Sequence, residues 1–326
     1  MANAQQSGSG YGWRAVVPAT SANLGCAFDC GGLALQLYLS AFFTADDGQG
    51  LTLEYSGETP ERFPLDESSL ILHALRFAAN ELHAPAPRGR VVVQSAIPIG
   101  VGLGSSAAAV IAGLLLGTRY AGAEVVAEEL LRWAAQIEGH LDNAAAAYHG
   151  GLVFALSSGL ERVVTFRTKF PETIKLMIVT PEATVSTHES RKALPEKYSR
   201  EDVLHVTQRL AAFAATCFSG DFAVIPEFFD DRLHQPYRQE LVPGMERCLR
   251  LRHPGLLGVA ISGSGSSVIA FVQERETEIA EKLRQIFAED GQKTTSRITP
   301  ADNNGAWVSR EPVRIVQATQ ELENRK

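Results

Sequence analysis

A glycine-rich segment, PIGVGLGSSAA from Pro98 to Ala108, is the part of the sequence best suited to chemistry. Glycine lets the backbone approach a ligand closely and adopt φ angles that other residues avoid. The small apolar residues that follow predict a helix from Ser105 to Tyr120, and the first N–H groups of a helix have no partner within it. With the positive end of the helix dipole, these amides make an anion site. The segment therefore predicts a loop that binds phosphate groups.

Three other interpretations of this segment exist. A Walker A loop needs a lysine after its glycines, and the chain has none there. The stretch from Gly102 to Ala107 does match the G-x-G-x-x-A pattern of dinucleotide-binding folds. Those folds continue with a second strand that ends in an acidic residue, whereas Glu124–Glu138 predicts a helix, so a dinucleotide-binding oxidoreductase is the runner-up. A tight turn under a helix does not explain why glycines, serines and alanines occur together here.

The overall composition excludes several classes of protein. With 326 residues, of which 45% are hydrophobic and 21% charged, the chain can bury the cores of two domains. A net charge of -7 without a basic run argues against nucleic-acid binding. The longest apolar stretch, Ala107–Gly117, is too short for a bilayer, and the polar start does not resemble a signal peptide. We therefore expect a cytoplasmic protein that binds neither nucleic acid nor membranes.

Strands and helices gather in separate runs along the chain, which favours an α+β fold over a doubly wound sheet. We expect residues 1–12 to be a disordered lead and the segment FRTKFPETIK, near residue 170, to separate two domains. Hydrophobic patterning predicts strands at 13–19, 34–45, 51–55, 90–97, 151–156, 163–167, 174–180, 256–262 and 267–272. It predicts helices at 66–82, 105–120, 124–138, 199–218 and 274–289.

The glycine-rich segment resembles a signature of the galactokinase, homoserine kinase, mevalonate kinase and phosphomevalonate kinase superfamily, P-x3-G-L-G-S-S-A. The segments Pro18–Gly32 and Gly258–Ser267 resemble two further motifs of that superfamily. The stretches at 138–143, 186–195 and 231–238 resemble homoserine kinases in particular. The resemblance runs in consistent order from about residue 14 to residue 308. Chance matches to single motifs would not keep that order.

The resemblance implies an α+β kinase with two domains. An N-terminal domain, residues 13–168, would bind ATP, and a ferredoxin-like C-terminal domain, residues 169–326, would form the other side of a cleft. The implied reaction transfers the γ-phosphoryl group of ATP to the side-chain hydroxyl of L-homoserine, a step toward threonine. A related kinase for another small alcohol and a non-catalytic nucleotide-binding regulator are the alternatives. The family also implies a homodimer.

The resemblance assigns charged residues to the two ends of the homoserine backbone. The carboxylate would bind Arg191 and Arg238, since guanidinium forks suit carboxylates, and the ammonium group would bind Asp29. Other polar residues of the same motifs would complete the substrate site: Asn23, His140, Thr187 and Gly263.

Asn143 and Thr187 are the catalytic residues that the resemblance implies. Asn cannot take a proton at neutral pH, so we expect these side chains to orient the homoserine hydroxyl, whose proton goes to phosphate or solvent late in transfer. The backbone amides of Gly102–Ser105 would hold phosphate. The implied ATP-binding residues are Pro98, Ile99, Gly100, Val101, Gly102, Leu103, Gly104, Ser105, Ser106, Ala107 and Ala108.

Magnesium is the metal that the resemblance implies, with the Ser106 hydroxyl and Glu138 as its protein ligands. Mg²⁺ prefers a few protein oxygens together with phosphate oxygens. The residues alone leave a second interpretation open, because Glu138, His140 and Asp142 alternate along one short segment. Two carboxylates and an imidazole could bind a transition metal instead.

Overall fold

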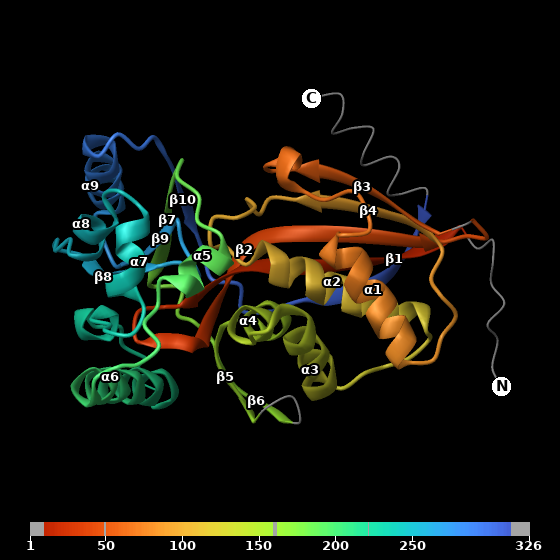
Figure 1. Ribbon diagram of the computed structural model, residues 1–326, viewed down its shortest axis with the longest axis horizontal. Helices are drawn as coiled ribbons and strands as arrows, with labels where there is room; N and C mark the ends of the chain where they lie inside the picture. Colours follow the sequence, from red (N-terminus) through yellow and green to blue (C-terminus); the bar gives the residue numbers. More distant parts are fainter. Residues whose placement is uncertain (1–9, 49, 159–161, 221, 314–326) are drawn as a thin grey trace.

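The computed structural model describes residues 10–48, 50–158, 162–220 and 222–313, which form two adjoining sheets with their helices (Figure 1). The larger sheet contains β1 Tyr11–Asn23, β2 Ala27–Ala45, β3 Leu51–Gly57, β4 Gly89–Ser95, β5 Leu152–Ser158, β6 Arg162–Thr168 and β11 Trp307–Pro312. Its order is β11-β1-β2-β4-β3, and β5 and β6 extend it from β2. Only β3 and β4 are parallel neighbours among these strands, so the sheet is mixed.

Four helices lie on one side of the larger sheet (Figure 1), and the first of them packs mainly against the second. They are α1 Leu70–Glu81, α2 Ser105–Tyr120, α3 Ala127–Glu138 and α4 Asp142–His149. α2 is apolar on every side, and its residues are buried from Ala107 to Thr118. A helix of this kind must be covered all round. The sheet and the other three helices provide that cover, which places the glycine-rich segment at a rigid helix end.

The smaller sheet has the order β10-β7-β9-β8 and is antiparallel throughout. Its strands are β7 Lys175–Pro181, β8 Leu256–Ile261, β9 Val268–Val272 and β10 Thr294–Thr299. The helices of this half are α5 Thr187–Lys192, α6 Arg200–Phe218, α7 Gln235–Arg238, α8 Met245–Leu249 and α9 Glu276–Glu289. Helical segments connect β7 to β8 and β9 to β10. This βαββαβ order is that of a ferredoxin-like domain, as expected, and the α+β fold class is confirmed.

Short 3-10 turns connect several of these elements, at Pro60–Arg62, Pro226–Phe229 and Gln239–Leu241. Within the described ranges, no helix combines the length and the apolar character needed to cross a bilayer.

Some boundaries lie elsewhere than the sequence pattern suggests. Residues 1–9 of the expected lead are outside the described residues, and Tyr11 and Gly12 already belong to β1. The last described strand, β11, belongs to the larger sheet, because it pairs with β1. The expected helix at 66–82 begins at Leu70, since Asp66 uses its carboxylate to accept hydrogen bonds from Ser68.

Two glycines of α2 allow it to approach α1 closely. A Cβ on Gly113 would lie 2.4 Å from the Ile71 carbonyl oxygen and 2.7 Å from the Ala74 Cβ. At Gly117 the same geometry recurs one turn later, with the Leu75 carbonyl oxygen at 2.5 Å. At each glycine a Cβ would meet a backbone carbonyl oxygen, which cannot move aside as a flexible side chain can. The separation of the two helices is therefore set by these glycines.

We expect Gly113→Ala to destabilise the protein by about 1–3 kcal/mol, because the new methyl group pushes the two helices apart. Helix propensity alone predicts the opposite, a gain of about 1 kcal/mol. Urea unfolding measures the difference. Gly50→Ala is the control, because a Cβ there meets nothing within 4 Å. A Gly113→Ala protein as stable as the wild type would contradict the close-packing argument.

Candidate active site

The glycine-rich stretch Pro98–Gly104, here named the glycine loop, runs from β4 to the start of α2. Gly102 and Gly104 have φ angles of 84° and 67°, which L side chains rarely adopt. A Cβ on Gly102 would lie 2.0 Å from the Ser262 carbonyl oxygen, and one on Gly104 would lie 1.9 Å from Thr20 Oγ1. Glycine is therefore required at both positions. α2 begins at Ser105, so the N–H groups of its first turn remain available to a ligand.

The three motifs found in the sequence meet at this loop. Ser262 Oγ donates a hydrogen bond to the Gly102 carbonyl oxygen at 2.7 Å. Three backbone hydrogen bonds join the same segments: Thr20 N–H to the Leu103 oxygen at 3.1 Å, Ser267 N–H to the Val101 oxygen at 3.2 Å, and Gly263 N–H to the Ala22 oxygen at 3.0 Å. The loop is thus held in place from both sheets.

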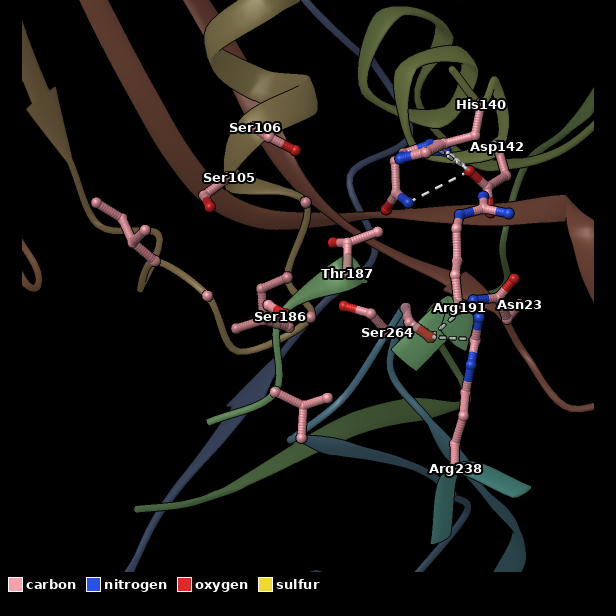
Figure 2. Close-up of a pocket in the computed structure, with 18 of the residues that line it drawn as sticks. Asn23, Ser105, Ser106, His140, Asp142, Ser186, Thr187, Arg191, Arg238 and Ser264 are labelled. Atoms are coloured by element: carbon pink, nitrogen blue, oxygen red, sulfur yellow. Dashed lines mark hydrogen bonds and ion pairs between the residues drawn. The ribbon is translucent and has the colours of Figure 1, made fainter. Parts of the chain in front are cut away.

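A cavity of about 230 Å³ opens beside the glycine loop. In Figure 2, Ser105 and Ser106 lie on one side of this cavity, and Arg191 and Arg238 lie on the other. Most of the residues expected at the site line it: Asn23, Asp29, Ile99, Gly100, Gly102, Leu103, Gly104, Ser105, Ser106, His140, Asn143, Thr187, Arg191, Arg238 and Gly263. The cavity therefore joins a helix N-terminus to a group of charged side chains.

Five of the expected residues do not line the cavity. Val101, Ala107 and Ala108 are buried in the core under the loop and the first turn of α2. Pro98 is not among the lining residues, and the Glu138 carboxylate lies behind Ser106. The buried residues shape the loop and the first turn of α2, and Glu138 accepts a hydrogen bond from Ser106, which does face the cavity.

An ion pair joins Asp29 and Arg191 across the cavity. Arg191 Nη2 and Nη1 lie 3.0 and 3.2 Å from the two carboxylate oxygens of Asp29, which is a forked arrangement. Asp29 is held by its backbone, with a φ of 54° and its N–H donating to Asn23 Oδ1 at 3.0 Å. Asn23 in turn donates to the Gly263 carbonyl oxygen at 2.7 Å. The position of the carboxylate is therefore determined by the motif around it.

Arg238 is buried, with 4% of its surface exposed, yet its partners are neutral. Its guanidinium donates to the carbonyl oxygens of Gly263 and Ser190 at 3.2 and 3.4 Å, and it lies 5.0 Å above the ring of Phe28. Burial lowers the pKa of this guanidinium, while the nearby Asp29 carboxylate raises it. A positive charge enclosed in this way attracts an anionic group of a ligand.

Asn143 is fixed by neighbours on both sides. Thr20 Oγ1 donates to its Oδ1 at 2.8 Å, and its Nδ2 donates to Asp142 Oδ1 at 3.3 Å. Asp142 Oδ1 also accepts from the Asn143 N–H at 2.8 Å and lies 3.2 Å from His140 Nδ1, a contact drawn in Figure 2. This hydrogen bond raises the pKa of His140. The network holds the Asn143 amide at the cavity wall.

Ser106 and Glu138 meet at the start of α2. The Ser106 hydroxyl donates to Glu138 Oε2 at 3.1 Å, and burial raises the pKa of the Glu138 carboxyl. The alternative of a transition-metal site at Glu138, His140 and Asp142 has no support, because the described parts of the chain contain no group of three such ligands that could hold a metal.

Several cavity residues were not among the expected substrate and ATP residues. Asp142, Val185, Ser186 and Ser264 also line it. Asp142, Ser186 and Ser264 each lie next to an expected residue in one of the motifs, which was the available signal, whereas Val185 lies just outside them. Local pattern does not distinguish a side chain that faces the cavity from its neighbour.

Comparisons with known proteins agree with this geometry. The family model described as GHMP kinases N terminal domain matches residues 69–151, and GHMP kinases C terminal matches residues 216–289. A homoserine kinase of Solibacter usitatus is 38% identical over 84% of this chain and 90% of its own length. One from Moorella thermoacetica is 35% identical over 90% of this chain and 98% of its own length. The chain belongs to the homoserine kinase family of GHMP kinases.

A solved structure of homoserine kinase from Cytophaga hutchinsonii has the same fold, with a TM-score of 0.81 and 24% identity over 94% of this chain and all of that one. Membership in the GHMP kinases makes the chain a small-molecule kinase with ATP as its co-substrate. The runner-up interpretation of the glycine loop, a dinucleotide-binding oxidoreductase, is therefore not favoured.

His234 lies behind Arg238 in this GHMP kinase and is completely buried. Its Nε2 donates to the Gly25 carbonyl oxygen at 2.8 Å, so its Nδ1 is free to accept from Arg238 Nη1 at 3.4 Å. The imidazole also stacks on Phe28, with the rings 5.0 Å apart. Burial lowers the pKa of His234, and Arg238 acts in the same direction, against the opposing charge of Asp231. The neutral imidazole therefore fits this site.

We expect acid to destabilise the protein through His234. Its pKa is lower in the folded than in the unfolded chain, despite the opposing charges of Asp231 and Asp29. The stability that it contributes is complete above the unfolded pKa of about 6.5 and is lost as the pH falls through the folded pKa. His234→Gln keeps a donor for the Gly25 oxygen. This substitution should reduce the slope of the unfolding free energy against pH by up to about 1.4 kcal/mol per pH unit.

Urea unfolding between pH 8 and pH 5.5 measures this slope. His73→Gln on the exposed face of α1 is the matched control and should retain the wild-type slope. A His234→Gln protein with an unchanged slope would show that the imidazole does not titrate differently on folding.

Proposed function

We propose that this protein is a homoserine kinase, which transfers the γ-phosphoryl group of ATP to the hydroxyl of L-homoserine and releases O-phospho-L-homoserine. The observation that carries the proposal is the cavity with a helix N-terminus on one side and Asp29, Arg191 and Arg238 on the other. The first suits phosphate groups and the second suits an α-amino acid. The curated relatives named homoserine kinase support the same conclusion.

The two substrates would lie along the cavity. Amides of Gly102–Ser105 would hold the phosphates of ATP, and Arg191 and Arg238 would bind the carboxylate of homoserine. Asp29 would bind the ammonium group. The remaining polar residues expected around homoserine would be Asn23, His140, Thr187 and Gly263, all of which line the cavity. In this arrangement the side-chain hydroxyl of homoserine would point toward the glycine loop, because its carboxylate and ammonium groups would be bound on the opposite side of the cavity.

Mg²⁺ fits the residues at the start of α2. The Ser106 hydroxyl and the Glu138 carboxylate are both hard oxygen donors, and they already lie 3.1 Å apart. Two protein oxygens leave positions for phosphate oxygens and water, as Mg²⁺ prefers. When bound, the ion would neutralise part of the charge on the phosphates. Ser106 and Glu138 would hold it.

Asn143 would orient the attacking hydroxyl rather than deprotonate it, because an amide takes no proton at neutral pH. Thr187, at the start of α5, would approach the hydroxyl from the other side. Asp142 is the acid next to Asn143, but one of its oxygens is already occupied by His140 and Asn143. Transfer would then depend on positioning, and the hydroxyl proton would leave with the phosphoryl group or to solvent.

A cytoplasmic location and a homodimeric state belong to the same proposal. The location rests on the composition of the chain, and the dimer rests on the resemblance described above. Cell fractionation and light scattering measure them.

The acceptor is tested by following ADP release with ATP, with and without Mg²⁺, and one of homoserine, serine, mevalonate, galactose or no acceptor. We expect release only with homoserine and only with Mg²⁺. Mevalonate lacks the ammonium group that Asp29 would bind, and galactose has neither an ammonium group nor a carboxylate. Release that is independent of acceptor, or greatest with mevalonate or galactose, would overturn the proposal.

Asn143→Ala tests the positioning role. We expect kcat to fall by about 10²-fold at saturating substrates, because the hydroxyl is no longer held in line. Thr20→Val is a graded control, since it removes only the donor to Asn143 Oδ1 and should cause a smaller decrease in kcat. Unchanged turnover in Asn143→Ala would exclude that role.

A further inference from the structure

The Asp29–Arg191 ion pair joins two groups that would bind opposite ends of the substrate. The residues are 162 positions apart in the chain, one on β2 and one on α5, and both oxygens of the carboxylate are engaged. Each side chain is 40% exposed, so water reaches the pair and a ligand can replace it. The pair therefore occupies the place where a ligand's own charges would lie.

Arg238 lies at the same end of the cavity but is not part of this ion pair. No carboxylate of the described residues forms a salt bridge with it, and its hydrogen bonds go to two carbonyl oxygens and to His234. Asp29, Arg191 and Arg238 together carry one negative and two positive charges. This end of the cavity thus retains one guanidinium without a counter-ion, next to a pair that is internally neutral.

An α-amino acid carries its ammonium group and its carboxylate on the same carbon atom. Its carboxylate can meet Arg238 and Arg191 while its ammonium group meets Asp29, so the pair opens without leaving any charge unmatched. An alcohol with only a carboxylate leaves Asp29 without a cation. An alcohol with only an ammonium group leaves Arg191 without an anion, and an unmatched charge in a partly enclosed site is costly.

We propose that the Asp29–Arg191 pair takes the place of the substrate's two charged groups and is exchanged for them as a unit, so that the site favours ligands that carry both an ammonium group and a carboxylate. This inference rests on the proposed homoserine kinase function and concerns how the acceptor is selected. Selectivity then comes from competition with the pair, in addition to the contacts made with the ligand.

A substitution that breaks the pair should strengthen the binding of some ligands, whereas the loss of a simple contact would only weaken binding. Asp29→Asn frees Arg191, so a ligand with only a carboxylate should bind more tightly than it does to the wild type. Arg191→Gln frees Asp29 and should do the same for a ligand with only an ammonium group. Homoserine should bind more weakly to both variants, since each has lost one of its partners.

NMR titration of the full chain measures the dissociation constants of three compounds without requiring turnover. They are homoserine, 4-hydroxybutyrate, which lacks the ammonium group, and 3-amino-1-propanol, which lacks the carboxylate. We expect 4-hydroxybutyrate to bind Asp29→Asn about two- to fivefold more tightly than the wild type, and 3-amino-1-propanol to gain similarly in Arg191→Gln. Homoserine should weaken at least about tenfold in each.

The double variant Asp29→Asn with Arg191→Gln distinguishes exchange of the ion pair from simple repulsion of the ligand by Asp29. If Asp29 merely repels a carboxylate, Asp29→Asn will improve 4-hydroxybutyrate binding equally when Arg191 is already Gln. If the pair is exchanged, that gain is smaller in the double variant, because no Arg191 is released to bind the carboxylate. Glu54→Gln is the matched control, because it removes one carboxylate from a forked and exposed pair with Arg90, far from the charged end of the cavity, and should change none of the three constants.

Unchanged or weaker binding of 4-hydroxybutyrate to Asp29→Asn would overturn the inference, as would a gain that is equally large when Arg191 is already Gln. Failure of the proposed function is a different result. It would appear as wild-type protein that does not phosphorylate homoserine in the ADP assay, whatever the titrations report.

Discussion

The contact between the glycine loop and the turn after β8 is the constraint on which the site depends. Gly102 can take its position only because it has no side chain, since a Cβ would lie 2.0 Å from the Ser262 carbonyl oxygen. Ser262 Oγ then hydrogen-bonds to the Gly102 carbonyl oxygen, so the two segments hold each other. Because one segment leads into α2 and the other belongs to the smaller sheet, this contact sets the helix N-terminus opposite the charged residues.

Local groups, rather than overall charge, make this acidic chain suitable for anions. The net charge is -7, yet the cavity has a helix N-terminus on one side and two guanidinium groups on the other. Arg238 can remain charged although it is buried, because carbonyl oxygens, the ring of Phe28 and a neutral His234 surround it. The protein thus concentrates positive potential where phosphate and carboxylate groups would lie.

Elements with a strong local pattern were predicted well, and elements that depend on distant partners were not. The predicted helix at 105–120 has the bounds of α2, and 124–138 ends where α3 ends, because both show a clear helical pattern. β1 and β2 extend into the motif between the predicted strands through positive φ angles at Asn23 and Asp29. Strands β10 and β11 and the short helices α4, α5, α7 and α8 were missed, although Ser186 and Glu189 form a local capping box at the start of α5.

The sequence alone determined the chemistry that this chain offers: an anion-binding helix start, residue types that suit an amino acid, and the family in which these motifs occur together. Those features are local, so order and spacing reveal them. Only the tertiary structure decided that Val101, Ala107 and Ala108 are core residues and that Arg238 is enclosed with no salt bridge to a described carboxylate. It also decided that Asp29 pairs with Arg191. Such contacts depend on how the two sheets and α5 pack together, and no local periodicity encodes that packing.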